Sequence, residues 1–324
     1  RGRKGDAMIS YDFQYSLNSL AVKPELLNVK DYIDQHKLTN DNSGFDDYAV
    51  LQLIDEGVWD GRFSTDWYDV ALSVSPTIRH NVSIKGANEK SSYFLSLGNV
   101  SDDGVLVGKN DTYNRFTVSL NADYQVKKWL KVGTTADFAH YAARPISDGV
   151  ELSGSSSAPN TFQSILNQAP YVASTYSPDA LPLEMQLALN GGSKLFTDEN
   201  GNYYETLAYV HPYLTTLMQT RKNYGDRLSG TLFANLTPIK GLVYTSRLGY
   251  KVYTDNTYRY IVPGYYGGSE PEVTDLNGTT RENKSTVYYQ WENFVNYNTT
   301  VGDKHNIGAM AGMSFSQNDM TYLM

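Results

Sequence analysis

MISYDFQYSLN, residues 8–18, alternates strictly between two kinds of side chain. From Ile9 to Leu17 the odd-numbered positions are apolar or aromatic, and from Ser10 to Asn18 the even-numbered ones are polar. Because successive side chains of a β-strand point to opposite faces, this stretch predicts a strand with one apolar and one polar face. Soluble sandwiches and transmembrane barrels both use such strands, so the charges and the connections must separate the two.

Eight further segments alternate in the same way. They span residues 77–86, 91–100, 114–126, 129–142, 227–237, 242–253, 286–297 and 305–316. The connections between the nine predicted strands are by turns long and short, and the long ones cover residues 19–76, 101–113, 143–224 and 254–285. Outer-membrane barrels have this asymmetry, with short periplasmic turns and longer extracellular loops.

Charged side chains within the predicted strands all occupy the polar phase. They include Asp12, Arg79, Lys85, Asp123, Lys131, Asp137, Arg227, Arg247, Lys251 and Glu292. A bilayer would enforce this segregation, since a cation on the lipid face near the midplane costs about 2–4 kcal/mol. A soluble sheet would also segregate charge, because its apolar face would be its core. The loop asymmetry therefore favours a membrane barrel, and the charged inner face predicts a channel or a plugged lumen.

Composition excludes several other classes of protein. The 27 tyrosines suit a boundary between apolar and aqueous zones, and the net charge of −8 argues against nucleic-acid binding. The chain has no cysteine, which rules out disulfides, zinc–thiolate sites and thiol nucleophiles. No apolar run approaches the length of a membrane helix, and residues 1–5 are basic, so we expect any signal peptide to be missing from this sequence.

A series of ordered motifs runs through the first part of the chain. They are Thr65–Asp69, His80–Ser83, Gly86–Lys90, Gly104–Leu106 and Trp129–Gly133, with Arg1–Gly5 at the start. These motifs resemble those of the SusC/RagA-type TonB-dependent outer-membrane transporters of Bacteroidetes. The resemblance covers residues 1–135 and is architectural beyond them. Ala87, Asn99 and Ser119 stand where the family commonly has a glycine, an aromatic and a basic residue.

The resemblance implies an all-β fold: a partial transmembrane antiparallel β-barrel, about nine strands of a roughly 22-stranded whole, whose long extracellular loops contain short helices. An odd number of strands also predicts an incomplete barrel, since bacterial single-chain barrels have an even number. Residues 1–6 would end the plug and its junction, and residues 7–324 would form the N-terminal portion of the barrel.

The resemblance also implies a function. We expect a multi-pass protein of the cell outer membrane that imports a large nutrient, a glycan or oligosaccharide first and a peptide second. Its expected partners are a SusD-like surface lipoprotein that acts as a lid, TonB acting through a segment upstream of this chain, and outer-membrane lipid. We expect no enzymatic activity, no catalytic residue, no metal and no cofactor.

Candidate binding residues lie in the long connections. Aromatic rings are natural platforms for sugar faces, which makes these tyrosines candidate substrate contacts: Tyr171, Tyr176, Tyr203, Tyr204, Tyr265 and Tyr266. The alternative is that they pack the loops or an interface. Helix-like patterns occur at residues 28–36, 47–57 and 161–168, and Trp67 is expected to anchor the first connection.

Metal-site signals are weak. Asp198–Asn202 resembles a calcium loop only faintly and predicts an ordinary turn, and the five histidines lack paired spacing. We expect His80 and His140 at the outer ends of strands. Two other functions stay open: a passive porin or surface adhesin barrel, and a soluble β-rich carbohydrate-binding module.

Overall fold

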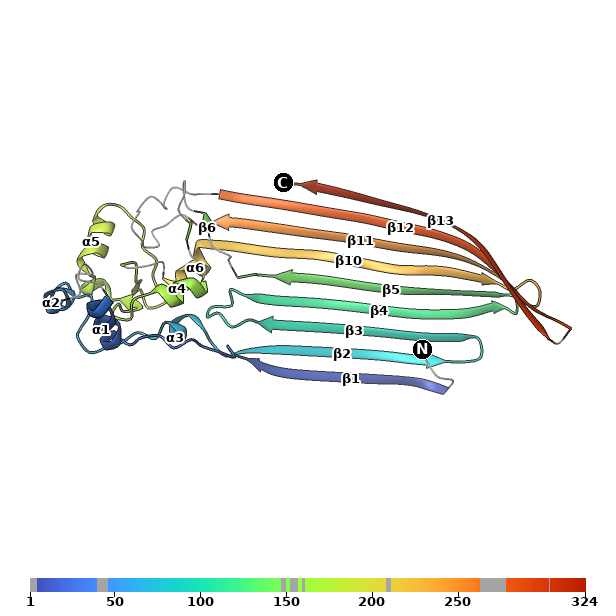
Figure 1. The fold of residues 1–324 in the computed structure, drawn as a ribbon, viewed down its shortest axis with the longest axis horizontal. Coiled ribbons are helices and arrows are strands. Elements are labelled where there is room, and N and C mark those ends of the chain that lie inside the picture. The colour runs from blue at the N-terminus through green and yellow to red at the C-terminus, as the bar shows by residue number, and fades with distance from the viewer. Residues whose placement is uncertain are drawn as a thin grey trace.

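A computed structural model describes residues 5–39, 46–146, 150–151, 157–158, 161–207, 211–262, 278–302 and 304–324. A nine-stranded antiparallel sheet dominates it, with the strand order β1-β2-β3-β4-β5-β10-β11-β12-β13 (Figure 1). Its strands are β1 (Gly5–Asn18), β2 (Ser75–Ala87), β3 (Ser91–Asp103), β4 (Thr112–Lys127), β5 (Leu130–Ala143), β10 (Gln219–Leu236), β11 (Leu242–Ile261), β12 (Gly278–Val301) and β13 (His305–Leu323). The nine strands predicted from alternation are thereby confirmed.

The two longest connections carry the helices. Residues 19–74 contain α1 (Val29–Thr39), α2 (Asp47–Asp55) and α3 (Trp67–Ala71). Residues 144–218 contain α4 (Thr161–Asn167), α5 (Leu183–Asn190), α6 (Pro212–Met218), a 3-10 turn (Pro178–Ala180), and two ribbons that pair β6 (Val150–Glu151) with β7 (Ser157–Ala158) and β8 (Thr175–Tyr176) with β9 (Tyr203–Tyr204). Together these segments form the cap, which lies at one end of the strands (Figure 1).

Local capping explains where the predicted helices begin. The Asn28 side chain accepts a hydrogen bond from the Asp31 amide at 3.0 Å, and Asp46 accepts one from the Ala49 amide at 2.8 Å. The predictions at 28–36, 47–57 and 161–168 are confirmed, whereas α3, α5 and α6 were not predicted. No helix in the described part of the chain is long and apolar enough to cross a membrane.

Four strands reach well beyond their predicted ends toward the cap. β10 begins at Gln219 rather than at residue 227, β11 continues to Ile261, and β12 already begins at Gly278, so the connections expected at 143–224 and 254–285 are shorter. β13 continues to Leu323 rather than ending at residue 316. These extensions have polar residues on both faces. Asn256, for example, pairs with Asn283, whose amide donates to it at 2.6 Å. Without an apolar face the alternation disappears, although the backbone ladder continues.

The first strand begins three residues earlier than the alternation predicted. Residues 1–4 lie outside the described part of the chain, and Gly5 already pairs with Ala87 of β2. The strand therefore begins inside the segment 1–6 that was expected to be the junction with a plug.

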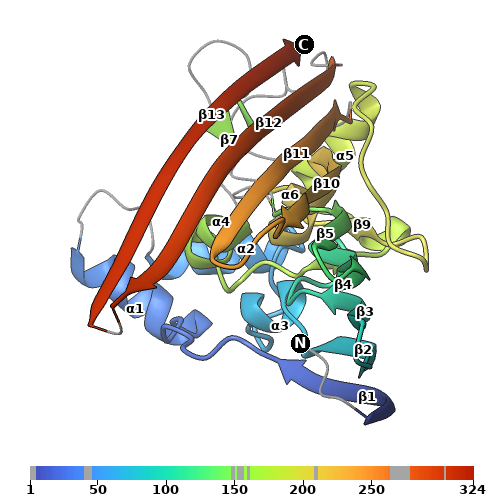
Figure 2. The ribbon, with the colours of Figure 1, turned by 90° about the vertical axis from the view of Figure 1, so that its right-hand side faces the viewer.

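Because of the register between the strands, the two faces of the sheet differ in polarity. One polar row runs Ser10-Ser83-Ser96-Ser119-Asp137-Ser229-Lys251-Tyr288-Asn318. The next row, on the opposite face, runs Tyr11-Val82-Leu97-Val118-Phe138-Leu228-Val252-Val287 and ends at Asp319 of β13. The sheet curves into an open trough (Figure 2), and the polar face lines a hollow, so we call it the inner wall and the apolar one the outer face.

Apolar side chains on the outer face are exposed. Ile9 is 71% exposed, Phe13 57% and Leu232 49%. An exposed apolar surface that spans nine strands is far larger than a soluble monomer tolerates, and a bilayer covers such a band.

The apolar band crosses the register obliquely. On β1 its five-residue run is centred on Phe13, and on β13 the corresponding run is centred on Ala311. Pairing places Phe13 in one row with Thr321, ten residues from Ala311. That offset is about 33 Å along the strands, over eight inter-strand steps of about 38 Å in total, so the strands are tilted by about 40° from the normal to the band. Outer-membrane barrel strands are tilted by about 35–45°.

Candidate functional site

The inner wall contains a broad polar hollow. It has a volume of about 690 Å³ and is lined by β5 and β10 to β13, with Asp137, Arg247, Lys251, Tyr288 and Glu292 among its residues. Arg247 and Glu292 form an ion pair with an N–O distance of 3.6 Å, and the Lys251 ammonium lies 5.8 Å from the centre of the Tyr288 ring. The wall therefore offers charges and an aromatic surface to whatever fills the trough.

A second inner-wall cluster lies closer to the cap. The Tyr141 hydroxyl donates to Asp255 Oδ1 at 2.6 Å, and Arg227 Nη2 lies 3.6 Å from the same oxygen. The Arg227 guanidinium also lies 5.6 Å from the Tyr141 ring centre and 5.8 Å from that of Tyr253. This arrangement is a cation held between two aromatic faces, and it ties β5, β10 and β11 together.

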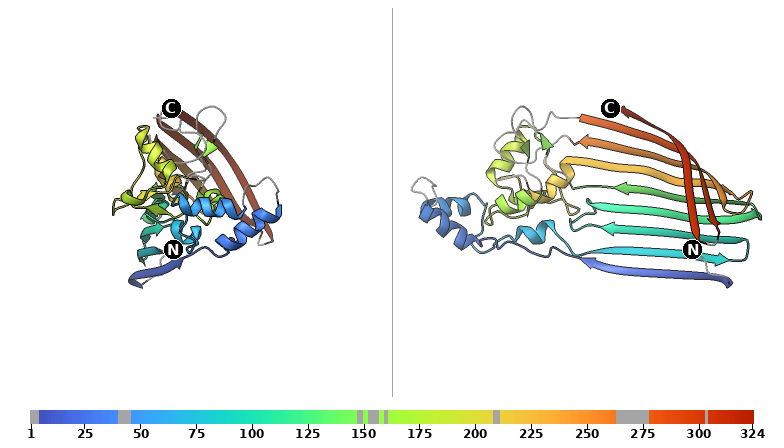
Figure 3. Two further views of the ribbon diagram at one scale, coloured as in Figure 1. Left: turned by 90° about the vertical axis from the view of Figure 1, so that its left-hand side faces the viewer. Right: turned by 45° about the vertical axis from the view of Figure 1, so that its right-hand side comes forward.

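Both long connections are joined in the cap by a seam of hydrogen bonds. Trp67, 1% exposed, donates from Nε1 to the Ala169 carbonyl at 3.0 Å. Thr65 donates from its amide to the Pro170 carbonyl at 2.9 Å and from its hydroxyl to the Val172 carbonyl at 2.6 Å. The helices lie across the mouth of the trough as one packed unit (Figure 3). The prediction that Trp67 anchors the first connection is consistent with this burial.

Polar groups are enclosed behind the seam. His211 is fully buried, with its ring edge-on to Trp67 at 5.2 Å and tilted against Tyr204 at 5.2 Å between centroids. Its Nδ1 accepts a hydrogen bond from the Tyr213 amide at 3.1 Å. Burial lowers the pKa of His211 to about 3, so the ring is neutral at ordinary pH.

Glu205 is the other enclosed titratable group. It is fully buried, and its carboxylate accepts hydrogen bonds from the Gln168 side chain and from the Leu207 amide. A buried carboxylate with such donors keeps its hydrogen-bonding capacity satisfied, so it rigidifies the second connection.

Four of the six candidate tyrosines lie in the described part of the cap. Tyr176 is buried, donates to the Val58 carbonyl at 3.1 Å and accepts from the Ala173 amide at 3.1 Å. Tyr171 packs edge-on to Tyr32 at 5.9 Å, and burial raises its pKa to about 12. Tyr176 thus has a packing role, while Tyr171 keeps a partly exposed surface.

Tyr203 and Tyr204 are also partly exposed. Tyr203 packs against the buried cluster around Met185, and Tyr204 lies 5.2 Å from Tyr213. Burial, with Tyr213 and acidic neighbours, raises the Tyr204 pKa to about 12. Tyr265 and Tyr266 lie outside the described residues. The structure therefore brings four candidates into one cap without arranging their rings as an open platform.

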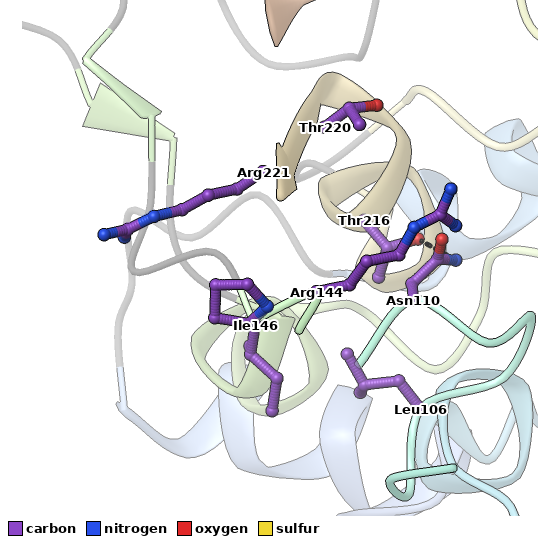
Figure 4. Close-up of a pocket in the computed structure, with 8 residues that line it drawn as sticks. Leu106, Asn110, Arg144, Ile146, Thr216, Thr220 and Arg221 are labelled. Atoms are coloured by element: carbon purple, nitrogen blue, oxygen red, sulfur yellow. Dashed lines mark hydrogen bonds between the residues drawn. The ribbon is translucent and has the colours of Figure 1, made fainter. Parts of the chain in front are cut away.

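A small polar pocket lies where the cap meets the sheet (Figure 4). It encloses about 30 Å³, room for about one water molecule, and is lined by Asn110, Arg144, Thr216 and Arg221 among others. Asn110 donates to the Thr216 hydroxyl at 3.1 Å, which fixes α6 to the β3–β4 connection. The Arg144 and Arg221 side chains point in opposite directions (Figure 4).

The turn at Asp198 and the two histidines have different outcomes. Asp198 accepts hydrogen bonds from the amides of Asn200 and Asn202 at 2.8 Å each, as an ordinary turn does. No group of three or more potential metal ligands occurs within the described ranges. His140 lies near the cap end of β5, but the expectation for His80 is wrong. His80 lies well inside β2 on the outer face, where the Tyr11 hydroxyl is 2.9 Å from its Nδ1.

Sequence reasoning missed the cluster of Tyr141, Arg227 and Asp255. Arg227 was recognised as a charge of the polar phase, but Asp255 fell in a segment predicted to be a loop. The available signal was short, because only Tyr258 and Tyr260 at the end of β11 alternate with the polar Thr257 and Arg259.

Comparison with known proteins agrees with this architecture. No family model matches the chain. It is 24% identical over 98% of its length to TonB-dependent receptor P39 of Formosa agariphila, of which it covers 27%. It is 30% identical over 34% of its length to TonB-dependent receptor SusC of Bacteroides thetaiotaomicron, of which it covers 11%. The chain thus spans less than a third of these relatives, whose names describe receptors and not enzymes.

The fold is similar to solved structures of RagAB. The similarity to the RagAB peptide importer in its open-open state has a TM-score of 0.71 at 16% identity, and it covers 99% of this chain and 35% of that chain. For the closed-closed state the TM-score is 0.68 at 17% identity. In its motifs, its sequence relatives and its fold, the chain is similar to part of a SusC/RagA-type TonB-dependent receptor.

Proposed function

We propose that the chain forms the N-terminal portion of the barrel of a multi-pass outer-membrane importer for a large nutrient. One observation carries this proposal: an exposed apolar band backs a charged inner wall with a hollow of about 690 Å³. A barrel too wide to be filled by its own side chains forms a channel or holds a plug. The TonB-dependent receptors among the relatives support the plug.

Partners follow from this assignment. We propose that residues 1–6 join the barrel, residues 7–324, to an upstream plug that contacts the inner wall. A SusD-like surface lipoprotein would close over the cap, and TonB would displace the plug through a segment upstream of this chain. The enclosed seam around Trp67 supports a rigid seat for such a lid, because both long connections meet there.

For the substrate we propose a glycan, with a peptide as the alternative. The partly exposed Tyr171, Tyr203 and Tyr204 are proposed contacts, together with Tyr265 and Tyr266. The similarity to the RagAB peptide importer supports the alternative. Native mass spectrometry of the complete protein with mixed oligosaccharides and oligopeptides distinguishes the two. Tyr203→Ala should weaken glycan capture, whereas Tyr48→Ala, on the 76%-exposed Tyr48 of α2, should not.

Removal of the second connection tests the importer. Replacing residues 144–218 by a short turn in the complete protein should abolish lid capture and uptake while leaving membrane insertion intact. Tyr48→Ala, which leaves both long connections in place, provides the control and should keep lid capture and uptake. Unchanged uptake together with unchanged complex formation would contradict the proposal.

A passive pore is the second candidate, and the charged inner wall is the observation that favours it. Planar-bilayer recordings of the complete protein separate the two functions. A plugged importer should show negligible steady conductance without partners, whereas an open porin should conduct continuously.

A further inference from the structure

On the outer face, lysine and arginine occur only beyond the ends of the apolar runs. Within the apolar runs of the nine strands this face carries neither residue. Beyond the cap-side ends of those runs, three cations appear in one row. Lys222 of β10 pairs with Tyr258 of β11, which pairs with Arg281 of β12. Arg144 follows β5 directly and continues its ladder, since its amide donates to the Thr112 carbonyl at 2.8 Å. We call Arg144, Lys222, Tyr258 and Arg281 the basic row.

All members of the basic row belong to the outer face. The same strand phase holds Phe138 on β5, Leu228 on β10, Val252 on β11 and Val287 on β12, which form the last apolar row before the cap. Each member of the basic row lies six residues beyond its strand's member of that apolar row. By this phase the side chains of Lys222, Tyr258 and Arg281 project away from the trough, toward the layer that borders the barrel and not toward the plug. Arg144 also lines the small pocket where the cap meets the sheet, so the choice of ligand rests on the other three residues.

Distance from the hydrocarbon narrows the class of ligand. Six residues correspond to about 20 Å along a strand, or about 15 Å along the membrane normal at a tilt of about 40°. The head-group layer of an ordinary bilayer is only about 5–8 Å deep on each side. The basic row therefore stands at the level of a lipid head group that is larger than a phosphodiester, as in a glycolipid.

Charge and exposure favour an anionic ligand. Arg144, Lys222 and Arg281 are exposed, and none of them forms an ion pair with a residue in the described ranges. The nearest outward carboxylate along β10, Asp226, is already held by His140 at 2.9 Å. Arginine binds phosphate oxygens in a fork, and a tyrosine hydroxyl between two cations adds a donor.

We propose that the basic row binds phosphate groups of an anionic glycolipid in the leaflet that surrounds the cap side of the barrel. This inference rests on the proposed placement of the outer face in a membrane. It adds a specific lipid contact to the transporter and involves no residue of the inner wall.

Lipid titration of the complete, delipidated protein in neutral detergent tests the proposal by native mass spectrometry. The probes are a lipopolysaccharide with phosphates on its core sugars, the same lipid with those phosphates removed, and inorganic phosphate. The test variant is Lys222→Gln/Arg281→Gln. The matched control, Arg115→Gln/Lys284→Gln, removes the same charge from the inner-wall phase. Each cation near an anionic surface contributes about fivefold in affinity, so the test variant should bind the core-phosphorylated lipopolysaccharide about thirtyfold more weakly. The control should stay within about twofold of the unsubstituted protein.

Three outcomes would overturn the proposal: equal loss in both variants, equal binding of the dephosphorylated lipid, or saturation by inorganic phosphate, which would assign the row to a soluble anion. Should the test variant fold poorly, salt gives an independent measurement, because binding of the phosphorylated lipid alone should weaken as ionic strength rises. A protein that does not insert into membranes at all would contradict the proposed function instead, so the two failures are distinguishable.

Discussion

Trp67 shows how a single residue determines the order of the cap. Its ring is almost completely enclosed, its N–H is bonded to Ala169 of the other long connection, and its face meets the edge of His211. Because the surrounding cluster includes Val58, Ile165 and Val172, the ring packs against both connections at once.

Truncation of this side chain should open the seam. Replacing a buried aromatic by alanine costs about 3–5 kcal/mol, so Trp67→Ala should expose the amides that the seam protects, including that of Thr65. Hydrogen exchange of the complete protein measures this loss region by region. Tyr48→Ala, on the exposed face of α2, is the control. Unchanged protection around residues 65–72 and 161–172 in Trp67→Ala would contradict a central role for the ring.

Acid should loosen the cap through His211. Its pKa is about 3 when the cap is folded and near the ordinary 6.5 when it is open. Between these values the open cap binds a proton that the folded one does not. The contribution of His211 to the free energy of cap opening is therefore fully present above about pH 6.5. Between about pH 6.5 and the folded pKa of about 3, this contribution falls by up to about 1.4 kcal/mol per pH unit.

Hydrogen exchange as a function of pH checks this slope. His211→Asn keeps an acceptor for the Tyr213 amide but does not titrate, so the variant should lose this part of the pH dependence. Comparing the variant with the unsubstituted protein removes the contribution of Glu205, which is common to both. The same slope in both proteins would show that another group is responsible.

At the scale of elements, glycines control how closely neighbouring strands pack. Gly133 of β5 pairs with Phe233 of β10, and a Cβ at Gly133 would overlap the Phe233 ring. Gly249 of β11 differs, because the nearest atom to an added Cβ is the Gln290 carbonyl oxygen at 3.8 Å.

Alanine at these two positions should therefore behave differently. Gly133→Ala forces Phe233 to move and should destabilise the barrel by about 1–3 kcal/mol, the usual cost of overpacking. Gly249→Ala has space and should be nearly neutral. Denaturant unfolding of the complete protein, followed by its heat-modifiable gel migration, measures both. Equal stability of the two variants would contradict this account of the β5–β10 contact.

The predictability of each element from sequence depended on whether one face of it is apolar. β1 and β13 were predicted because lipid contact imposes alternation on them. The cap-side ends of β11 and β12 were missed because polar residues occupy both faces where no lipid lies. α6 was missed because Pro212–Met218 contains adjacent threonines, which are poor helix formers, and its stability comes from packing on α4 and from Asn110.

The candidate site was less predictable than the sheet. Residue type singled out Tyr176 and Tyr204 equally, yet only packing determines that Tyr176 is buried against Val58. Arg227 and Asp255 meet because β10 and β11 extend together, a fact that neither sequence segment contains alone.

At the scale of the whole molecule, the oblique apolar band makes a geometric prediction. If the nine strands cross a bilayer as the register indicates, their mean tilt from the membrane normal should be about 40°. Polarised infrared spectroscopy of the complete protein in oriented bilayers measures this angle from the amide I dichroism. A mean tilt below about 25° would contradict the register-based geometry, since barrel strands in outer membranes lie at about 35–45°.

Loops of membrane barrels usually diverge independently of one another. The hydrogen bonds of Thr65 and Trp67 to residues 169–172 remove that freedom here, because each connection supplies groups that the other needs. Residues 19–74 and 144–218 must therefore be inherited as a pair. A chimera that exchanges one of them with a relative leaves the Trp67 N–H or the Ala169 carbonyl without its counterpart, whereas exchanging both transfers the cap intact.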